Sequence, residues 1–511
     1  MTHSMNISRR KLLGTAGAAA ALTLAPQMSF AQTPKSGGDL VIAINGASTG
    51  NSLDPRTFNS PFMGVVSGTV FNTLVESFGP NSELKAGLAT SWAKSQGGLV
   101  WTFELAQNAK FHDGQNVNSA DVIYSLMSHV AEGSRSNSRA IIGGVDKIEA
   151  EGDHRIVVTL KAPNFFFPAG LSNYSLAIVP AGTTEYDGIG SGPYRITNFV
   201  PGEILETERF DDYFKDDKAH VSTVTILAAN DVSARVNAIQ SGQVHIASNL
   251  DARAVPLLQA LPTVNIEFLS GMGFAGFNMM VDRAPFDNLQ LRQAMKYAID
   301  REDFIQRLYA GYARLGNDTP VPPNAPEYAS SVAQISYDPD RARDLYAQSG
   351  HSGPIVLQTS SATGASAVDA ATLFKEHAAH AGIDIEVRRE PADGYWGNIW
   401  AKTPFHATLW GARPTVDLIM TLAYSGSSPA NDTGFRDAEF DEVLQMARGA
   451  SSPEARAQAI VKAQSILNER GGAIIPAFEN TPEGISSDLS GYTAGTLSVG
   501  SLRAAENVWF T

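Results

Sequence analysis

The sequence predicts an α/β protein with two lobes or more, and two observations carry that prediction. The chain has 511 residues, whereas a single hydrophobic core stops growing near about 250–300 residues. Strand, helix and strand also follow one another twice, over 224–247 and again over 354–387, in the order typical of parallel crossover units. The hydrophobic share of 43% is enough to fill buried cores in each lobe.

Short apolar runs bounded by turn residues predict the strands of the first half. Asp39–Asn45 is an apolar run that stops at Gly46, as a buried strand would. Asp113 and Gly114 form a turn dipeptide, so a short antiparallel meander is expected around them. By the same criteria, strands are expected at 100–105, 156–160, 193–196, 204–208, 224–227 and 244–247.

Helical spacing and capping residues predict the helices of the same half. Apolar residues recur at helical spacing over 65–76, which predicts a helix there. Asn118 is a capping side chain and Asp121 is an acid three residues later, so a second helix is expected to begin there and run through 122–130. A third helix, 232–241, would connect the two strands of the first crossover unit.

The second half alternates between the two periodicities. Its expected strands are 274–280, 354–358, 383–387, 408–410 and 474–478, and its expected helices are 289–299, 301–309, 340–348, 365–381, 439–448 and 454–470. The tail, 490–510, is expected to return to extended structure. Arg292 and Asp300 are expected to pair on or beside their helix.

The N-terminus carries an export signal. SRRKLL at 8–13 is a twin-arginine pattern, a 14-residue apolar stretch follows from 12 to 25, and Ser29-Phe30-Ala31 supplies small residues for cleavage. That stretch is too short to span a bilayer. We therefore expect a twin-arginine signal peptide over 1–31, with general secretion as the alternative, cleavage near Ala31 and a periplasmic protein.

Composition excludes several classes of function. The chain contains no cysteine, which removes disulfides, thiolate nucleophiles, cysteine-ligated metals and the cysteine of a lipid anchor, so the mature protein is expected to be soluble. A net charge of −14 argues against nucleic acid as a partner, because phosphate backbones would be repelled.

Motifs of catalysis and metal binding are missing from the sequence. It shows no nucleophile elbow, zinc-protease helix or dinucleotide fingerprint, and the loop 188–192 lacks phosphate-loop spacing. His377 and His380 share helical spacing but have no third ligand nearby. The acid pairs at 211–212 and 216–217 lack calcium-loop spacing. We expect no catalytic residue, no metal site and no cofactor.

An ordered set of short motifs carries a family resemblance. The motifs are LDP (53–55), FNTLVE (71–76), LATSW (88–92), WTF (101–103), KFHDG (110–114), SADV (119–122), GSGPY (190–194), SGQVHI (241–246), LRQAMKYAID (291–300) and YDP (337–339). Each is weak alone, but in this order the chain resembles the extracytoplasmic solute-binding proteins of family 5, the peptide- and nickel-binding group that serves ABC importers.

The resemblance implies a fold and a function. It implies a two-lobed type II periplasmic binding protein with an extra subdomain inserted in the first lobe. Lobe I would comprise 32–57, 190–267 and 482–511, the insertion 58–189, and lobe II 268–481, with a hinge near 268–273 and 476–482. Such a protein would be a monomer that captures a peptide or a similar small polar solute in the cleft and delivers it to ABC permease subunits.

One segment of lobe II holds most of the candidate ligand contacts. Trp410 would end a strand, and Arg413 would lie at a helix start that Pro414 opens, where a guanidinium and free N–H groups suit a carboxylate. Asp417 would lie about one turn on, or would simply complement the helix dipole. The further candidates in this lobe are Trp396, Trp400, Asn431 and Asp432, with core packing as the alternative for the tryptophans.

The loops after two strands of lobe I supply the remaining candidates, which are Asn45, Ser48, Thr49 and Asn249. Where many peptide-binding members of the family carry an acid after the tryptophan-bearing strand, this chain has Gly411-Ala412-Arg413. A peptide ammonium would then need Asp417, Asp432 or another acid. An anionic opine-like, sugar or metal-chelate ligand therefore stays open, as does an exported sensor in place of an importer component.

Overall fold

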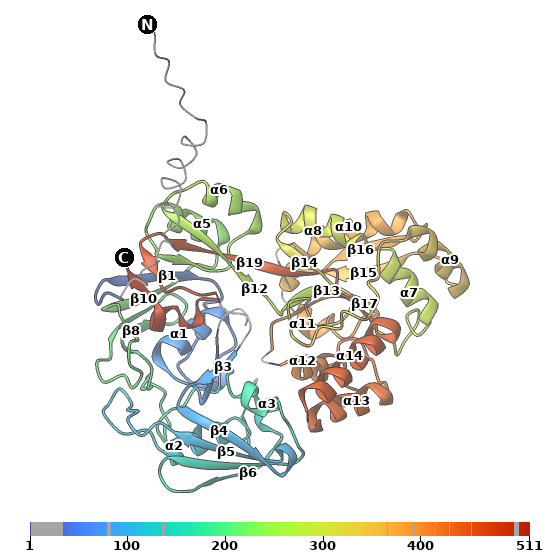
Figure 1. Ribbon diagram of the computed structural model, residues 1–511. Coiled ribbons are helices and arrows are strands. Elements are labelled where there is room, and N and C mark those ends of the chain that lie inside the picture. Colours follow the sequence, from blue (N-terminus) through green and yellow to red (C-terminus); the bar gives the residue numbers. More distant parts are fainter. Residues whose placement is uncertain are drawn as a thin grey trace.

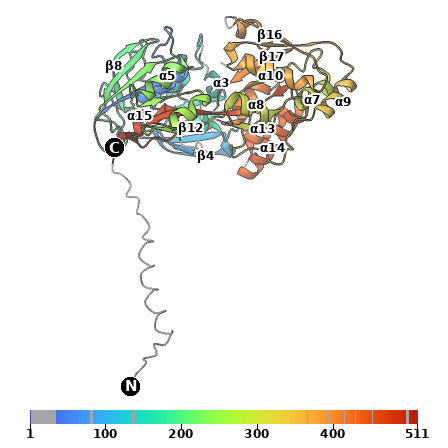
Figure 2. The same cartoon turned by 90° about the horizontal axis from the view of Figure 1, so that it is seen from above.

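A computed structural model describes Met1 and residues 34–511, apart from 79–82, 135, 137, 365, 392–393, 414, 429, 451 and 495–499. Apart from Met1, the predicted signal peptide lies outside these residues. The elements form two lobes that lie side by side (Figure 1 and Figure 2), joined by strands β12 (Val264–Ser270) and β19 (Ala477–Ser486). Among the residues described, no helix combines the length and apolarity that a bilayer crossing needs.

The sheet of the first lobe is built around a parallel centre. β1 (Asp39–Ile44) lies between β10 (Thr223–Ala228) and β11 (Ile246–Ala247) and is parallel to both. Helix α5 (Val232–Gln240) connects β10 with β11, so the predicted crossover unit forms with β1 between its strands. The order across the sheet is β12-β19-β11-β1-β10-β9-β8, with β8 at Tyr194–Val200 and β9 at Ile204–Arg209.

Helix α1 (Pro61–Val70) covers this sheet and differs from the helix predicted at 65–76. Ser60 caps it and Pro61 opens it, four residues earlier than expected. It ends at Val70, whose carbonyl accepts a hydrogen bond from Gly192 N (2.9 Å), and the chain then runs extended into β2 (Val75–Phe78). The prediction was wrong at this end because segments distant in sequence supply the hydrogen bonds.

The inserted region has a sheet and a core of its own. Its antiparallel order is β4-β5-β7-β6, and Phe103 and Ile156 are fully buried in the core beside it. Asn118 and Asp121 form the predicted capping box at the start of α2. The elements are β3 (Glu83–Ala86), β4 (Ala89–Ser95), β5 (Val100–Leu105), α2 (Ser119–Ser128), α3 (Arg139–Ile142), β6 (Val145–Ala150), β7 (Arg155–Leu160) and α4 (Phe167–Gly170).

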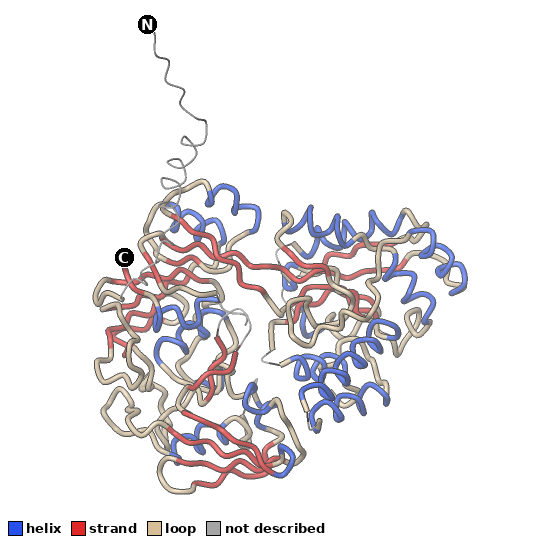
Figure 3. Tube along the Cα trace, viewed as in Figure 1, coloured by secondary structure: helices blue, strands red, loops and turns tan. Residues whose placement is uncertain are grey.

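The second lobe contains a sheet of order β16-β15-β17-β13-β18 with helices on both sides (Figure 3). The predicted unit β15–α10–β16 forms between adjacent parallel strands. Its strands are β13 (Phe274–Met279), β15 (Ile355–Thr359), β16 (Ile385–Arg389), β17 (Phe405–Trp410) and β18 (Ala473–Ile474). Its helices include α7 (Leu289–Tyr297), α8 (Arg301–Tyr309), α9 (Pro339–Ser349), α10 (Ala367–Ala379), α12 (Val416–Tyr424), α13 (Ala438–Gly449) and α14 (Pro453–Arg470).

The strand β19 takes part in both lobes. Asn480–Ser486 pairs with β12 in the first lobe, whereas Ala477–Glu479 pairs with β14 (Ala313–Leu315) in the second. The hinge predicted near 268–273 and 476–482 falls where these pairings meet. The bounds given for the lobes stay a prediction, and helix α1, inside the range expected for the insertion, packs into the first core.

The C-terminal tail and one charged pair differ from expectation. Among the described residues of the tail, β20 (Leu489–Ser490) and β21 (Trp509–Phe510) are extended, and α15 (Ala504–Asn507) precedes the last strand. Arg292 does not pair with Asp300. It donates to the carbonyls of Phe286 and Arg470, while Asp300 caps α8.

Candidate functional site

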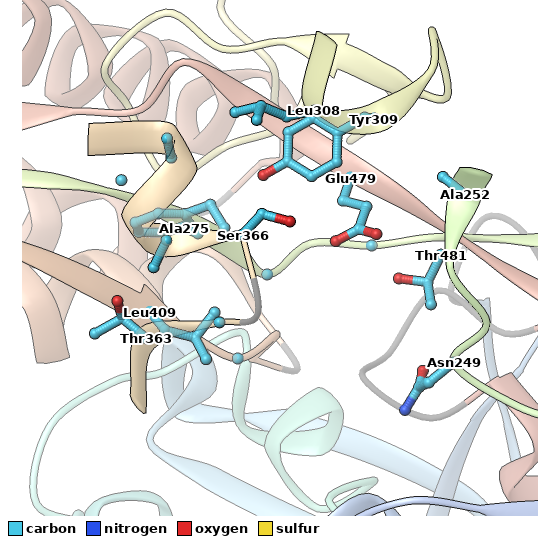
Figure 4. A pocket seen from close by; sticks show the side chains of 18 of the residues that line it. Asn249, Ala252, Ala275, Leu308, Tyr309, Thr363, Ser366, Leu409, Glu479 and Thr481 are labelled. Atoms are coloured by element: carbon cyan, nitrogen blue, oxygen red, sulfur yellow. The ribbon is translucent and has the colours of Figure 1, made fainter. Parts of the chain in front are cut away.

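A cavity of about 500 Å³ lies between the two lobes. Figure 4 shows Asn249 and Ala252 on its first-lobe side and Thr363, Ser366 and Tyr309 on its second-lobe side. The joining strands β12 and β19 form part of its wall, so a solute held here would contact both lobes and the segments that connect them.

Two of the expected first-lobe residues line this cavity together. Asn45 follows β1 and Asn249 follows β11, and these neighbouring parallel strands bring the two amides to the same sheet edge. Asn249 Nδ2 donates to Asn45 Oδ1 (2.6 Å). Asn249 has a φ of 54°, in the left-handed region that asparagine tolerates better than most residues. Arg235 Nη2 holds its carbonyl at 2.6 Å.

Ser48 and Thr49 are exposed and are not among the residues that line the cavity. The backbone N–H of Ser48 donates to Asn51 Oδ1 (2.7 Å), which closes the loop on itself. Their predicted role in ligand binding stays a prediction.

The expected tryptophans form a row of aromatic contacts. Trp396 lies 5.8 Å from Trp400, and Trp400 lies 6.1 Å from Trp410, measured between ring centroids. Trp410 lines the cavity, whereas Trp396 is 44% exposed at the other end of the row. Trp410 is therefore the one of the three whose indole a solute in this cavity would meet.

Asp432 holds two of these tryptophans in place by hydrogen bonds. Its Oδ2 atom accepts hydrogen bonds from Trp400 Nε1 (2.9 Å), Trp410 Nε1 (2.9 Å) and Thr408 Oγ1 (2.7 Å). The side chain is fully buried, and burial raises the pKa of Asp432 to about 6. Asp432 thus orients the aromatic wall and is not itself exposed to the cavity.

Arg413 and Asp417 have partners within the protein. Arg413 Nη1 donates to the carbonyls of Gly411 (2.9 Å) and Ala412 (3.1 Å), and its guanidinium lies 5.5 Å from the Trp410 ring centroid. Asp417 is buried and pairs with Arg448 (3.0 Å). The expected free helix start is instead capped by Thr415. Pro414 lies outside the described residues.

Asn431 also serves its own loop. Its Nδ2 atom donates to the carbonyls of Ser425 (3.1 Å) and Phe435 (2.6 Å), and its Oδ1 atom accepts from Thr433. Arg413, Asp417, Asn431 and Asp432 are not among the residues that line the cavity.

The joining strand β19 supplies two cavity residues that sequence reasoning missed. Glu479 and Thr481 both line the cavity, because alternate residues of a strand face the same side. Burial, followed by the negative charge of Asp251, raises the pKa of Glu479 to about 7. The segment had been singled out as a hinge, and its period of two could have indicated these side chains.

Metal chemistry finds no support in the described part of the chain, which brings no three His, Cys, Asp or Glu side chains into a metal-binding group. His377 is buried, and its Nε2 atom lies 2.9 Å from Asp303 Oδ2. His380 lies 2.7 Å from the Tyr337 hydroxyl. Both histidines therefore have structural partners.

Comparison with protein families matches residues 83–433 to the bacterial extracellular solute-binding proteins, family 5. A glutathione-binding protein, GsiB, of Pectobacterium atrosepticum is 28% identical over 391 residues, which cover 75% of this chain and 74% of the relative. Heme-binding protein A of Haemophilus influenzae is 24% identical over 468 residues, which cover 83% of this chain and 84% of the relative.

Solved structures share the fold. The periplasmic binding protein DppA of Helicobacter pylori, in complex with the peptide STSA, gives a TM-score of 0.80 at 23% identity, covering 93% of this chain and 98% of that one. AgaA of A. tumefaciens R10, in complex with agropinic acid, gives 0.79 at 23% identity, covering 93% and 99%. NikZ of Campylobacter jejuni, in complex with Ni(L-His), gives 0.79 at 22% identity, covering 92% and 99%.

Proposed function

Because the chain belongs to the bacterial extracellular solute-binding proteins of family 5, which serve ABC importers, we propose that it captures a peptide or a similar small polar solute between its lobes. The observation that carries this proposal is the cavity of about 500 Å³ with walls from both lobes and from the joining strands. A solute enclosed there would be shielded from water on every side. The protein would deliver it unchanged to the permease, as a periplasmic monomer and not as an enzyme.

Capture would work by closure about the joining strands. The ligand stabilises the closed arrangement only as far as it makes contacts there that the open arrangement lacks. A micromolar dissociation constant corresponds to about −8 kcal/mol, which is modest for a solute enclosed from two sides. Indole stacking on Trp410 and hydrogen bonds from Asn45 and Asn249 would supply part of that free energy.

A second ligand class rests on Arg413. Its half-buried guanidinium stacks near Trp410 and interacts electrostatically with Tyr174, from the region between β7 and β8. A small rearrangement of this side chain would present a cation to an anionic solute. An opine-like or sugar acid, or a metal chelate, is therefore the alternative cargo, and an exported sensor is the alternative use of the same closure.

Small-angle scattering and calorimetry test the proposal. Purified protein is screened by native mass spectrometry for co-purified solute and then titrated with di- and tripeptides, sugars, opines and nickel chelates. We expect a peptide to bind and to reduce the radius of gyration, because closure brings the lobes together. Binding without compaction would contradict closure, and chemical turnover of the solute would contradict delivery unchanged. Cells can also be grown on the bound solute as sole nutrient, with and without the gene for the permease. Growth that survives deletion of the permease would favour the sensor.

A further inference from the structure

Glu479 points into the cavity from a strand shared by both lobes. In the sheet, Glu479 pairs with Ala313 of β14, and its carboxylate lies between Tyr309 and Thr481 in Figure 4. The next residue, Asn480, faces the other side, where Arg314 Nη1 donates to its side-chain oxygen (2.6 Å). The one cation of the neighbouring β14 strand is therefore directed away from Glu479.

The described residues give the Glu479 carboxylate no hydrogen bond and no ion pair. Asp251 is near enough to influence it but is itself an acid, and both its oxygens are held by Arg253 (2.6 and 3.0 Å). Arg235 uses its guanidinium on the carbonyls of Ala229 and Asn249. The titratable and charged residues that line the cavity with Glu479 are Tyr309 of α8, Arg235 of α5, Asp251 before η3 (Ala252–Ala254) and Arg253 within it. The strands paired with β19 carry Arg314 on β14 and Glu267 on β12.

A partly buried carboxylate without a donor is costly unless something supplies one. The two acids that the sequence suggested for an amine do not line the cavity, since Asp417 is buried and pairs with Arg448, and Asp432 is fully buried behind the tryptophans that it hydrogen-bonds. Glu479 is thus the carboxylate of the cavity wall that has its acceptor oxygens available. A primary ammonium offers up to three N–H donors and a compensating charge.

Resting on the proposed function, we infer that Glu479 receives the ammonium group of an amine-bearing solute, such as a peptide amino terminus, and gives up its proton to solvent as that solute binds. Many peptide-binding members of the family bind the amino terminus with an acid after the tryptophan-bearing strand. In this protein, an acid on the joining strand would do so instead. Recognition of the solute is then coupled directly to the segment about which the lobes close.

The proton balance sets the pH dependence. In the free protein Glu479 is about half protonated near pH 7, because burial and Asp251 raise its pKa to about 7. The bound ammonium favours the ionised carboxylate, so below pH 7 each binding event must release a proton. Affinity therefore rises by up to tenfold per pH unit toward pH 7. It falls again above about pH 8, where a peptide amine loses its charge.

The test uses the full-length mature protein and three pairs of probes. Ala-Ala, Ala-Ala-Ala and glutathione are each titrated beside their N-acetylated forms, by calorimetry at pH 6 and 7 in two buffers that differ in ionisation enthalpy. We expect at least one free-amine probe to bind at least tenfold more tightly than its acetylated partner. We also expect release of about half a proton at pH 7, the fraction that Glu479 carries there.

Glu479→Gln keeps the shape of the side chain and removes its charge, so it should abolish both the amine preference and the proton release. Glu185→Gln makes the same charge change on an exposed loop and should alter neither. Thermal unfolding of both variants checks that they fold. Equal binding of free and acetylated probes, or an unaltered preference in Glu479→Gln, overturns the inference while compaction on binding still supports closure. If none of the probes binds, both the inference and the peptide assignment fall.

Discussion

At the scale of single residues, Asp432 holds the aromatic wall of the cavity in position. Its Oδ2 atom receives all three hydrogen bonds, from Trp400, Thr408 and Trp410, and Oδ1 has no partner in the described part of the chain. Asp432→Ala would leave the buried donors of Thr408 and Trp410 unpaired, at about 1–3 kcal/mol each, while Trp400 Nε1 keeps its contact with Thr408 Oγ1 (3.1 Å). We expect that variant to lower the free energy of unfolding by at least about 2 kcal/mol, measured by denaturant titration with tryptophan fluorescence.

Asp432→Asn is the matched control, because its amide oxygen can still accept those hydrogen bonds. Burial raises the pKa of Asp432 to about 6, so the folded state favours the protonated acid and the wild type loses stability as pH rises from about 4 to 6. The asparagine variant lacks that loss and should equal or exceed the wild type at pH 7.5. A decrease as large as that of the alanine variant would show that the charge, and not the hydrogen bonds, matters.

Residue type alone predicted only part of this site. Polar residues at the ends of parallel strands suggested Asn45 and Asn249 as ligand contacts, and both line the cavity because strand ends converge at one sheet edge, while their contact with a ligand stays a prediction. The expected helix start after Trp410 suggested Asp417 as a ligand contact, but Asp417 pairs with Arg448, which lies 31 positions away on another helix. Glu479 was missed because the availability of its carboxylate depends on where Arg314 and Arg253 direct their side chains.

At the scale of elements, the inserted region contacts the second lobe far from the joining strands. Phe165 N donates to the carbonyl of Arg448 at the end of α13 (3.2 Å), and the Arg456 guanidinium of α14 lies 5.1 Å from the Phe166 ring centroid. Opening of the lobes would break this contact. A cation–π contact contributes about 0.5–1 kcal/mol at an accessible site, a factor of about two to five in an equilibrium.

We therefore expect Arg456→Ala to shift the ligand-free protein toward the open form, with a larger radius of gyration in solution scattering and an unaltered radius when ligand is bound. Arg341→Ala is the control, since its guanidinium covers the Tyr297 ring within the second lobe (4.2 Å). If both variants scatter as the wild type does, the contact has no influence on closure.

Local patterns predicted elements well where the elements supply their own hydrogen bonds. The capping box of α2 and both crossover units formed as expected, since spacing and capping are local properties. The prediction misplaced helix α1, because the carbonyls of Asn72 and Val70 accept hydrogen bonds from Ile178 N and Gly192 N instead of from a continuing helix. Those donors come from more than a hundred residues along the chain, and local periodicity carries no information about them.

At the scale of the whole molecule, patterning predicted an α/β chain with more than one core, and family resemblance was needed for the two-lobed arrangement. The reason lies in β19, which pairs with β14 over three residues and with β12 over the next seven. The sequence predicted a strand only at 474–478, and no local pattern predicted one continuous strand from Ala477 to Ser486 that passes from one lobe to the other.

The stability of the molecule should depend on pH through buried groups with displaced pKa values. Burial raises the pKa of Glu483 to about 8 and that of Glu479 to about 7. Through each of these groups the folded protein loses stability as pH rises from the unfolded pKa, near about 4.3, to the folded pKa. Burial lowers the pKa of His129 and His406 to about 4. Through these histidines the folded protein loses stability as pH falls below about 6.5, which is their pKa in the unfolded state.

The two effects oppose each other below pH 6.5, and above it only the acids still titrate. Burial lowers the pKa of Lys296 to about 8, so that group adds stability only above pH 8. We expect a loss of stability on the order of 2 kcal/mol between pH 6.5 and pH 8, mostly from Glu483, whose side chain is fully buried beside Tyr492. Thermal scans of the wild type and Glu483→Gln between pH 5 and 8.5 measure it. The glutamine variant should show a much smaller fall, and a wild type whose midpoint keeps rising from pH 6.5 to 8 would contradict this account of the buried carboxyl groups.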